Sequence, residues 1–315
     1  MSRRRALLAA AALLLPATAH AQSPQGGQVV AGQARITQTP ARTDIAQSTP
    51  RAIIQWQGFD VGAGHQVDIR QPSATSWSLQ RVTGGNPSAI AGRVTSNGGV
   101  ALVNPAGIVF HQGAQVDVAS LIATGSDITN QNFMAGRMAF DGQPRPGARI
   151  ENRGTITVRE QGLAALVGPT VANSGTIRAR LGRVAMAGGA EGFTLDLAGD
   201  GLLSIDVTRQ VQAAPGGVAL VTNTGRIEAE GGQVLLSASA ASGVLETLVL
   251  AGGEITAAGG QVEMHAHGGG VRIEGSVSAT TGRIAATASG EVRLAAGATL
   301  EASGCLLYTS PSPRD

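Results

Sequence analysis

The stretch Ile150-Glu-Asn-Arg-Gly-Thr-Ile-Thr-Val158 determines the fold, because its pattern recurs along the chain. Alternation of apolar and polar residues is the periodicity of a β-strand, and Asn and Gly favour turns. Each copy therefore predicts strand, turn and strand. Clear copies occupy residues 171–179 and 221–229, and weaker copies occupy 249–257, 273–279 and 294–302.

A second glycine keeps step with this pattern. It stands five residues after the anchor Ile or Val in the copies that contain Gly182, Gly232, Gly260 and Gly282, and it slips by one residue to Gly162 in the first copy. Composition bias alone does not produce two patterns in constant register, so the chain is a structural repeat.

The repeat length predicts an all-β, right-handed parallel β-helix. Anchors at 156 and 177, 255 and 277, and 277 and 300 are 21, 22 and 23 residues apart. One such coil cannot bury its apolar row, whereas stacked coils about 4.8 Å apart can. The long interval from 177 to 227 predicts an extra-helical hairpin at residues 193–207. The segment before residue 60 is expected to cap the open strands. About 22 residues per coil predict roughly a dozen coils and a rod on the order of 60 Å long.

Both ends of the chain differ from this body. Three arginines at positions 3–5, a short apolar run and the small-x-small site Ala19-His20-Ala21 predict a signal peptide over residues 1–21, cleaved after Ala21. Residues 305–315 contain the only Cys and the only Tyr, and they resemble a translated sequencing adapter. We exclude them from the repeats and expect the natural protein to continue beyond about residue 304.

Composition excludes several classes of function for the body. Its basic residues are all arginine. Without the two ends the chain has 19 arginines and 20 carboxylates, so its charge does not argue for nucleic-acid binding. The body has no cysteine, which excludes disulfides and thiolate chemistry. No segment is long and apolar enough for a transmembrane helix.

Residues 52–128 carry a family resemblance. Their motifs include Ile53-Ile-Gln-Trp-Gln-Gly-Phe-Asp-Val-Gly62, Asn86-Pro-Ser-Ala-Ile-Ala-Gly92 and Leu102-Val-Asn-Pro-Ala-Gly-Ile-Val-Phe110. In this order they resemble the haemagglutination activity, or two-partner secretion, domain at the N-terminus of filamentous haemagglutinins and related exoproteins. We assign this domain, with its cap, to residues 22–136 and continuing β-helix repeats to residues 137–304.

The resemblance implies export across the inner membrane, and then recognition by a dedicated outer-membrane β-barrel with periplasmic chain-binding domains. Folding of the β-helix outside the cell would help make export directional. The product would be secreted or held at the surface of a Gram-negative cell, as a non-catalytic exoprotein or adhesin without a cofactor. Host-cell or surface glycan or protein receptors are further expected partners.

The family motif Asn-Pro-Asn-Gly-Ile falls on residues 104–108, where Ala106 replaces the second Asn. The resemblance implies a secretion determinant at Asn104, Pro105, Gly107 and Ile108. It implies a second determinant at Asn86 and Pro87. The same residue types also suit a plain turn, since Pro restricts φ, Gly permits positive φ and the Asn side chain bonds the backbone. Both interpretations stay open here.

The alternative function is a β-helix carbohydrate-active enzyme, a polysaccharide lyase or hydrolase. Such an enzyme needs clustered charged groups on one outer face. The nearest candidate is Glu263, His265 and His267, which share one face of a strand at a spacing that could hold a metal weakly. We favour a solvated strand face there, as at Glu228 and Glu230, and predict no catalytic or metal site.

Overall fold

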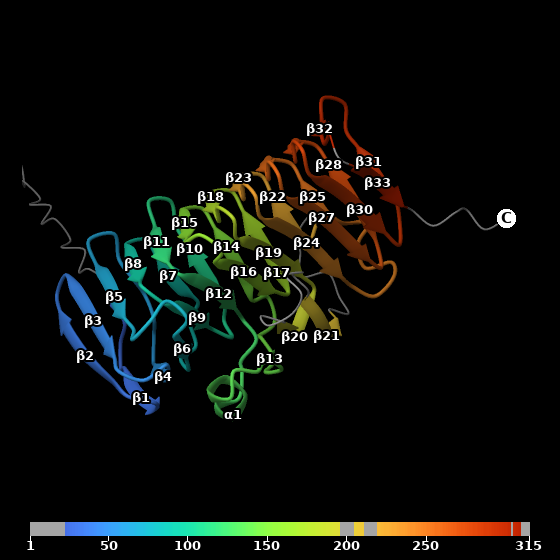
Figure 1. Ribbon diagram of the computed structural model, residues 1–315. Helices are drawn as coiled ribbons and strands as arrows, with labels where there is room; N and C mark the ends of the chain where they lie inside the picture. The colour runs from blue at the N-terminus through green and yellow to red at the C-terminus, as the bar shows by residue number, and fades with distance from the viewer. Residues whose placement is uncertain (1–22, 196–204, 211–218, 304, 310–315) are drawn as a thin grey trace, which may run out of the picture.

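The computed structural model describes residues 23–195, 205–210, 219–303 and 305–309 (Figure 1). Within the described residues, the regular secondary structure consists of strands and one short helix, α1 (Asn130–Met134). The predicted signal peptide and its cleavage residues Ala19 and Ala21 lie outside the described residues.

Three long sheets run side by side along the stack. Sheet 1 has 11 strands: β1 (Gln28–Ala31), β4 (Arg51–Trp56), β6 (Trp77–Val82), β9 (Gly99–Val103), β12 (Ser120–Thr124), β16 (Leu163–Gly168), β19 (Arg183–Gly188), β24 (Gln233–Ser239), β27 (Gln261–His267), β30 (Arg283–Ala288) and β33 (Cys305–Thr309). Sheet 2 has 11 strands: β2 (Ala34–Thr39), β3 (Arg42–Gln47), β5 (Gln66–Arg70), β8 (Arg93–Ser96), β11 (Gln115–Val118), β15 (Thr155–Val158), β18 (Thr176–Arg178), β23 (Arg226–Glu228), β26 (Glu254–Thr256), β29 (Ser276–Ser278) and β32 (Thr299–Glu301). Sheet 3 has eight strands: β7 (Ser88–Ile90), β10 (Ile108–Phe110), β14 (Arg149–Asn152), β17 (Thr170–Asn173), β22 (Val221–Asn223), β25 (Thr247–Ala251), β28 (Gly270–Ile273) and β31 (Val292–Leu294).

The anchor residues form one continuous inner column, as predicted. Ile156 pairs in parallel register with Ile177, and Ile177 pairs with Ile227. All three side chains are fully buried in the narrow interior. The 50-residue interval between the last two therefore contributes a single rung, and residues 190–195 and 205–210 of this interval pair outside the three long sheets. These excursions explain why the stack has fewer rungs than the roughly dozen expected from coil length.

The repeated glycines serve close packing between rungs. A Cβ at Gly175 would overlap the carbonyl oxygen of Gly154, and one at Gly232 would overlap the carbonyl oxygen of Gly182. These glycines do lie at the turns, but close approach of the rungs rather than a left-handed backbone accounts for them. The left-handed residue of the turn is instead the one before the second glycine, for example Leu181, whose φ is +53°.

The repeated asparagines form a buried ladder through the interior. Nδ2 of Asn152 donates to Oδ1 of Asn173 over 2.8 Å, and Nδ2 of Asn173 donates to Oδ1 of Asn223 over 2.7 Å. All three side chains are buried. Asn173, in the middle, thus accepts a hydrogen bond from one neighbouring rung and donates one to the next.

The N-terminal segment closes the first rungs, as expected. β1 pairs antiparallel with β4, and β2 pairs antiparallel with β3, whereas the strands that follow in both sheets are parallel. Two antiparallel strands therefore cover the starting edges of sheets 1 and 2, at the blue end of the ribbon in Figure 1.

Two excursions cover the outer face of sheet 1. β20 (Ala190–Leu195) and β21 (Ile205–Gln210) form the predicted hairpin, and the residues between them lie outside the described part. The sequence did not reveal that β13 (Met138–Phe140) pairs with β20 or that α1 precedes it. The rings of Phe140 and Phe193 stack with centroids 4.8 Å apart, which joins the two excursions.

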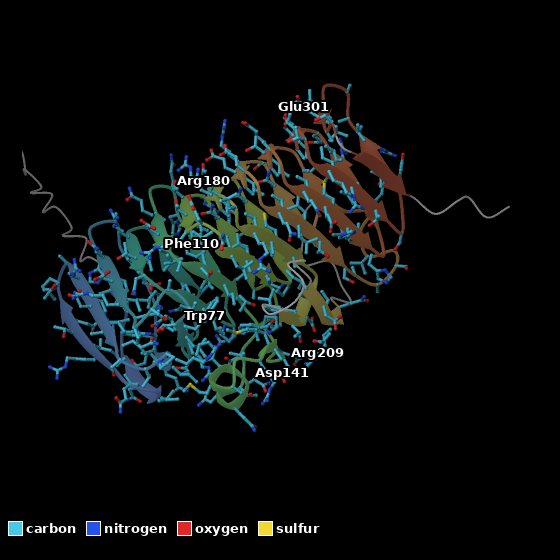
Figure 2. The ribbon with its side chains drawn as sticks, viewed as in Figure 1. Trp77, Phe110, Asp141, Arg180, Arg209 and Glu301 are labelled. Atoms are coloured by element: carbon cyan, nitrogen blue, oxygen red, sulfur yellow. The ribbon has the colours of Figure 1, made fainter. Side chains whose placement is uncertain are left out.

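These excursions bury a second apolar core. Outward side chains of sheet 1, such as Ile53 and Ile122, belong to this buried cluster together with Phe133 of α1. On the next rungs the outward column becomes polar, since Leu235 pairs with Glu263. The side-chain view in Figure 2 locates Asp141 and Arg209 in this excursion region, on the same side of the stack as α1 in Figure 1.

Candidate functional site

The residues expected to direct secretion occupy two turns on neighbouring rungs. One turn leads into β7 and contains Asn86 and Pro87, and the other leads into β10 and contains Asn104 and Pro105. Ile108 pairs with Ser88 in parallel register, so the two turns lie side by side. We call residues 84–88 and 104–107 the paired turns.

Asn104 connects the paired turns. Its Nδ2 donates to the carbonyl oxygen of Asn86 and to Oγ of Ser88, both over 3.0 Å. Its Oδ1 accepts the backbone N–H of Ala106 over 2.9 Å, which closes an Asx turn. The side chain is completely buried. Asn104 therefore specifies the geometry of both turns in the folded domain.

Gly107 completes this arrangement through its backbone. Its φ is +110°, a region that residues with a Cβ rarely adopt. Its N–H donates to the carbonyl oxygen of Asn104 over 2.9 Å, and its own carbonyl oxygen accepts the N–H of Ser88 over 3.0 Å. A larger residue here would strain the turn and approach the carbonyl oxygen of Arg149.

Ala106, where the family motif has Asn, uses only its backbone N–H in this turn. The Asx turn that Asn104 forms with it does not depend on a second amide side chain. Ala106 and Pro105 are half-buried, whereas Asn86 and Pro87 are exposed. The paired turns thus combine a buried bonding residue with an exposed surface.

Sequence reasoning missed two residues of this site. Ser88 accepts the amide of Asn104 through its hydroxyl. Arg145, which follows β13, contacts both turns: its backbone N–H donates to Pro105 over 2.7 Å, and its Nη1 donates to the carbonyl oxygen of Gly85 over 2.7 Å. The motif at residues 86–92 contains Ser88 but does not show that its hydroxyl meets Asn104. No motif signals Arg145, because its partner Gly85 is 60 residues away in the chain.

The outward face at β27 holds the candidate metal-binding residues. Oε2 of Glu263 lies 3.5 Å from Nε2 of His265, and Oε1 of Glu263 lies 3.4 Å from Arg283. Nδ1 of His265 lies 2.6 Å from Oγ1 of Thr287. Across the described residues, no three His, Cys, Asp or Glu side chains gather where a metal ion could be held.

Other outward carboxylates take part in ion pairs between rungs. Glu228 pairs with Arg178 over 2.8 Å, and Glu254 pairs with Arg226 over 2.6 Å. Glu160 and Arg180 pair at the adjoining turn. These charges join successive rungs along the solvated face.

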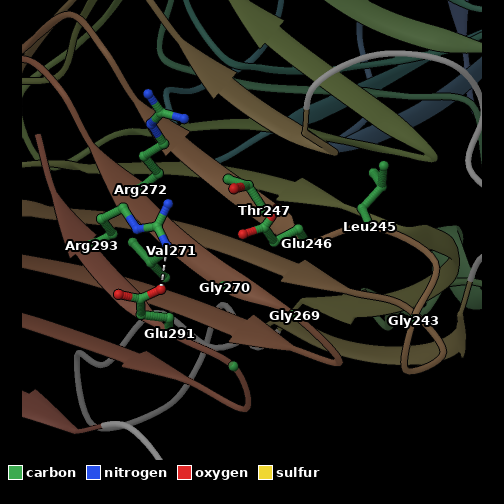
Figure 3. A pocket seen from close by; sticks show the side chains of 11 residues that line it. Gly243, Leu245, Glu246, Thr247, Gly269, Gly270, Val271, Arg272, Glu291 and Arg293 are labelled. Atoms are coloured by element: carbon green, nitrogen blue, oxygen red, sulfur yellow. Dashed lines mark hydrogen bonds and ion pairs between the residues drawn. The ribbon is translucent and has the colours of Figure 1, made fainter.

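A half-open hollow of about 470 Å³ lies near the C-terminal rungs, lined by residues 243–247, 269–272 and 290–293 (Figure 3). Its two arginines already have carboxylate partners. Arg293 pairs with Glu291 over 2.7 Å, and Arg272 pairs with Glu274 over 2.7 Å. The hollow therefore offers a glycine-lined surface with charges that are largely paired.

Among the described residues no helix combines the length and the apolar character that a membrane span requires. The model of the TPS (two-partner secretion) secretion domain family matches residues 20–294. The heme/hemopexin-binding protein of Haemophilus influenzae strain Rd is 36% identical over 224 residues, which are 68% of this chain and 23% of that protein. A second heme/hemopexin-binding protein of H. influenzae is 41% identical over 106 residues, 33% of this chain and 11% of that protein.

Solved structures agree with this match. The HMW1 secretion domain of H. influenzae superposes with a TM-score of 0.73 at 27% identity, covering 89% of this chain and 73% of that one. The filamentous hemagglutinin secretion domain has the same fold, with a TM-score of 0.68 at 17% identity, covering 92% and 100%. The resemblance found in the motifs is confirmed, and proteins with this domain are secreted by Gram-negative two-partner systems. The chain belongs to the two-partner secretion domain family.

Proposed function

We propose that residues 22–304 together, and not residues 22–136 alone, are the secretion domain of an exoprotein. We further propose that a dedicated outer-membrane transporter recognises this domain through its periplasmic chain-binding domains. The family match over residues 20–294 carries this proposal. The passage is from periplasm to cell exterior, and the paired turns are the part of the domain on which it depends.

The solenoid suits such a passage. Each rung bonds mainly to its neighbours, so folding can begin at one rung and propagate without waiting for distant segments. The only cysteine of the chain is Cys305, so no disulfide within residues 22–304 can close before export. Burial of the inner column then favours the folded state outside the cell and opposes return of the chain.

Asn104 acts, in this proposal, through folding of the turns. Its buried side chain is out of reach of a partner once the domain has folded. Asn86 differs, because its carbonyl oxygen takes part in the turn while its side chain is exposed. The two asparagines therefore separate a folding role from direct recognition of an exposed amide.

The test is a secretion assay in cells that express the full chain with its transporter. We expect Asn104→Ala to lower the fraction of protein in the medium while synthesis stays constant, and Asn86→Ala to secrete normally. The matched control is Asn152→Ala, which also removes a buried, bonded amide, but from the ladder. Secretion of Asn104→Ala at the level of the unaltered chain would contradict the proposal. An equal loss of secretion in Asn152→Ala would show that the paired turns act only through the general stability of the fold, which would also contradict it.

We further propose that this domain is non-catalytic. The ion pairs of Glu228, Glu254 and Glu263 with arginines support a structural role for the outward carboxylates. Binding to host or surface receptors, if the exoprotein is an adhesin, is assigned in this proposal to parts of the exoprotein outside the secretion domain. Polysaccharide cleavage by the purified domain would contradict the non-catalytic assignment.

A further inference from the structure

The first excursion, residues 125–148, is fastened at its start by Arg81. Arg81 lies on the outward face of β6 and is buried. Its Nε donates to Asp127 over 2.8 Å, its Nη1 donates to Asn130 over 2.6 Å, and its Nη2 bonds the carbonyl oxygen of Ile128. Arg81 therefore positions the chain where it leaves the stack. It lies only a few residues before the first of the paired turns.

The same excursion is fastened at its end by Arg145. Two donors of its guanidinium reach the carbonyl oxygens of Gly85 and Gly84, over 2.7 and 3.3 Å. Its backbone N–H donates to Pro105 in the other turn over 2.7 Å. The carbonyl oxygen of Arg145 accepts the N–H of Ala148 over 3.0 Å, which folds the returning chain into a turn of its own. One residue thus holds both of the paired turns.

We propose that Arg145 is a positioning residue of the secretion determinant, and that the paired turns become locked only when the excursion has folded against them. This inference rests on the proposed function and adds to it a residue outside the recognised motif. Arg145 acts on the carbonyl groups of the turns. Through them it acts on Asn104, whose side-chain amide donates to the carbonyl oxygen of Asn86.

The chemistry of arginine suits this role. A guanidinium presents its donors in a rigid planar fork, so it can bond two successive carbonyl oxygens, which a lysine ammonium on a flexible stem does poorly. The glycine pair accommodates the fork: a Cβ at Gly85 would lie 3.3 Å from Nη1 of Arg145. A Cβ at Gly84 would overlap the carbonyl oxygen of Gln57. Glycine at these two positions therefore leaves room for the guanidinium at Gly85 and for the close approach of Gln57 at Gly84.

The experiment compares the full chain with Arg145→Ala and Arg145→Lys. The matched control is Arg209→Ala, because Arg209 is also an exposed arginine that donates to one carbonyl oxygen, that of Asp141, within the excursions (Figure 2). Hydrogen exchange is measured by mass spectrometry on peptides that contain Ser88, Gly107 and, as a reference, Ile177. Secretion is measured in parallel.

Arg145→Ala is expected to speed exchange of the Ser88 and Gly107 peptides about fivefold, the change that loss of one ordinary hydrogen bond produces in local opening. The Ile177 peptide should not change, secretion should fall below that of Arg209→Ala, and Arg145→Lys should be intermediate. Unchanged exchange at the paired turns, or an equal rise at Ile177, would overturn the positioning role.

The two proposals fail separately. If Asn104→Ala blocks secretion while Arg145→Ala secretes as well as Arg209→Ala, the paired turns remain the determinant and the role of Arg145 is refuted. If Asn104→Ala secretes normally, the proposed function of the turns is refuted, whereas the exchange of the Ser88 peptide still reports whether Arg145 holds them.

Discussion

Replacing Asn173 with alanine is expected to destabilise the fold by about 2–5 kcal/mol, because this residue is the middle of the buried asparagine ladder. Its Oδ1 accepts Nδ2 of Asn152 over 2.8 Å, and its Nδ2 donates to Oδ1 of Asn223 over 2.7 Å. Alanine removes both bonds and leaves a polar atom without its ladder partner on each neighbouring rung.

The magnitude follows from burial. Oδ1 of Asn223 loses its ladder donor in a position shielded from water, which costs about 1–3 kcal/mol. Nδ2 of Asn152 keeps the carbonyl oxygens of Gly154 and Thr176 as acceptors at 3.4 Å, so its lost bond costs at most about 1 kcal/mol. The space left by the lost amide adds a cavity term of about 1 kcal/mol. Asn223→Ala strands only Nδ2 of Asn173, which keeps a second acceptor, the carbonyl oxygen of Arg226, at 3.4 Å. It should therefore cost about half as much.

Urea unfolding of the purified domain, followed by circular dichroism, measures both free energies of unfolding. The exposed Asn86→Ala serves as the control and is expected to change the free energy by less than about 0.5 kcal/mol. A loss of less than about 1 kcal/mol for Asn173→Ala would show that water or relaxation replaces the ladder, and would refute the reasoning.

Two further variants test the turn conformation and the charges. Thr281→Gly is expected to stabilise the domain by about 0.5–1 kcal/mol, because φ of Thr281 is +59° and a β-branched residue is strained there; Thr280→Gly should destabilise it, and a thermal melt distinguishes the two. Burial by itself would raise the pKa of Asp68, but hydrogen bonds from Thr95 and Arg70, together with nearby arginine charges, hold it below the ordinary 3.8. A depressed folded pKa stabilises above the unfolded value, so this contribution is lost as the pH falls below about 4. Asp68→Asn should therefore flatten the acid side of the stability profile, and an unchanged slope between the two chains would contradict this assignment.

The site was only partly predictable. The motif at residues 104–108 pointed to Asn104 and Gly107, and the turn chemistry explained why those residue types occur together. Motif spacing could not reveal that Asn104 is buried and bonded to Asn86, 18 residues earlier, because that contact depends on which turns stack. Arg145 gave no signal at all, since its bonds to Gly84 and Gly85 join segments about 60 residues apart.

The sequence by itself determined the repeating unit, the inner column and the strand order. These follow from a pattern read within one coil and repeated in the next, so that Ile156, Ile177 and Ile227 could be aligned before any coordinates. Only the tertiary structure decided where the chain leaves the stack and what the excursions cover. Packing of Phe140 on Phe193 and the bonds of Arg81 and Arg145 all involve the excursions, which lie outside the repeating unit. Such contacts have no periodicity, and their energies depend on the assembled surface rather than on neighbours in the chain.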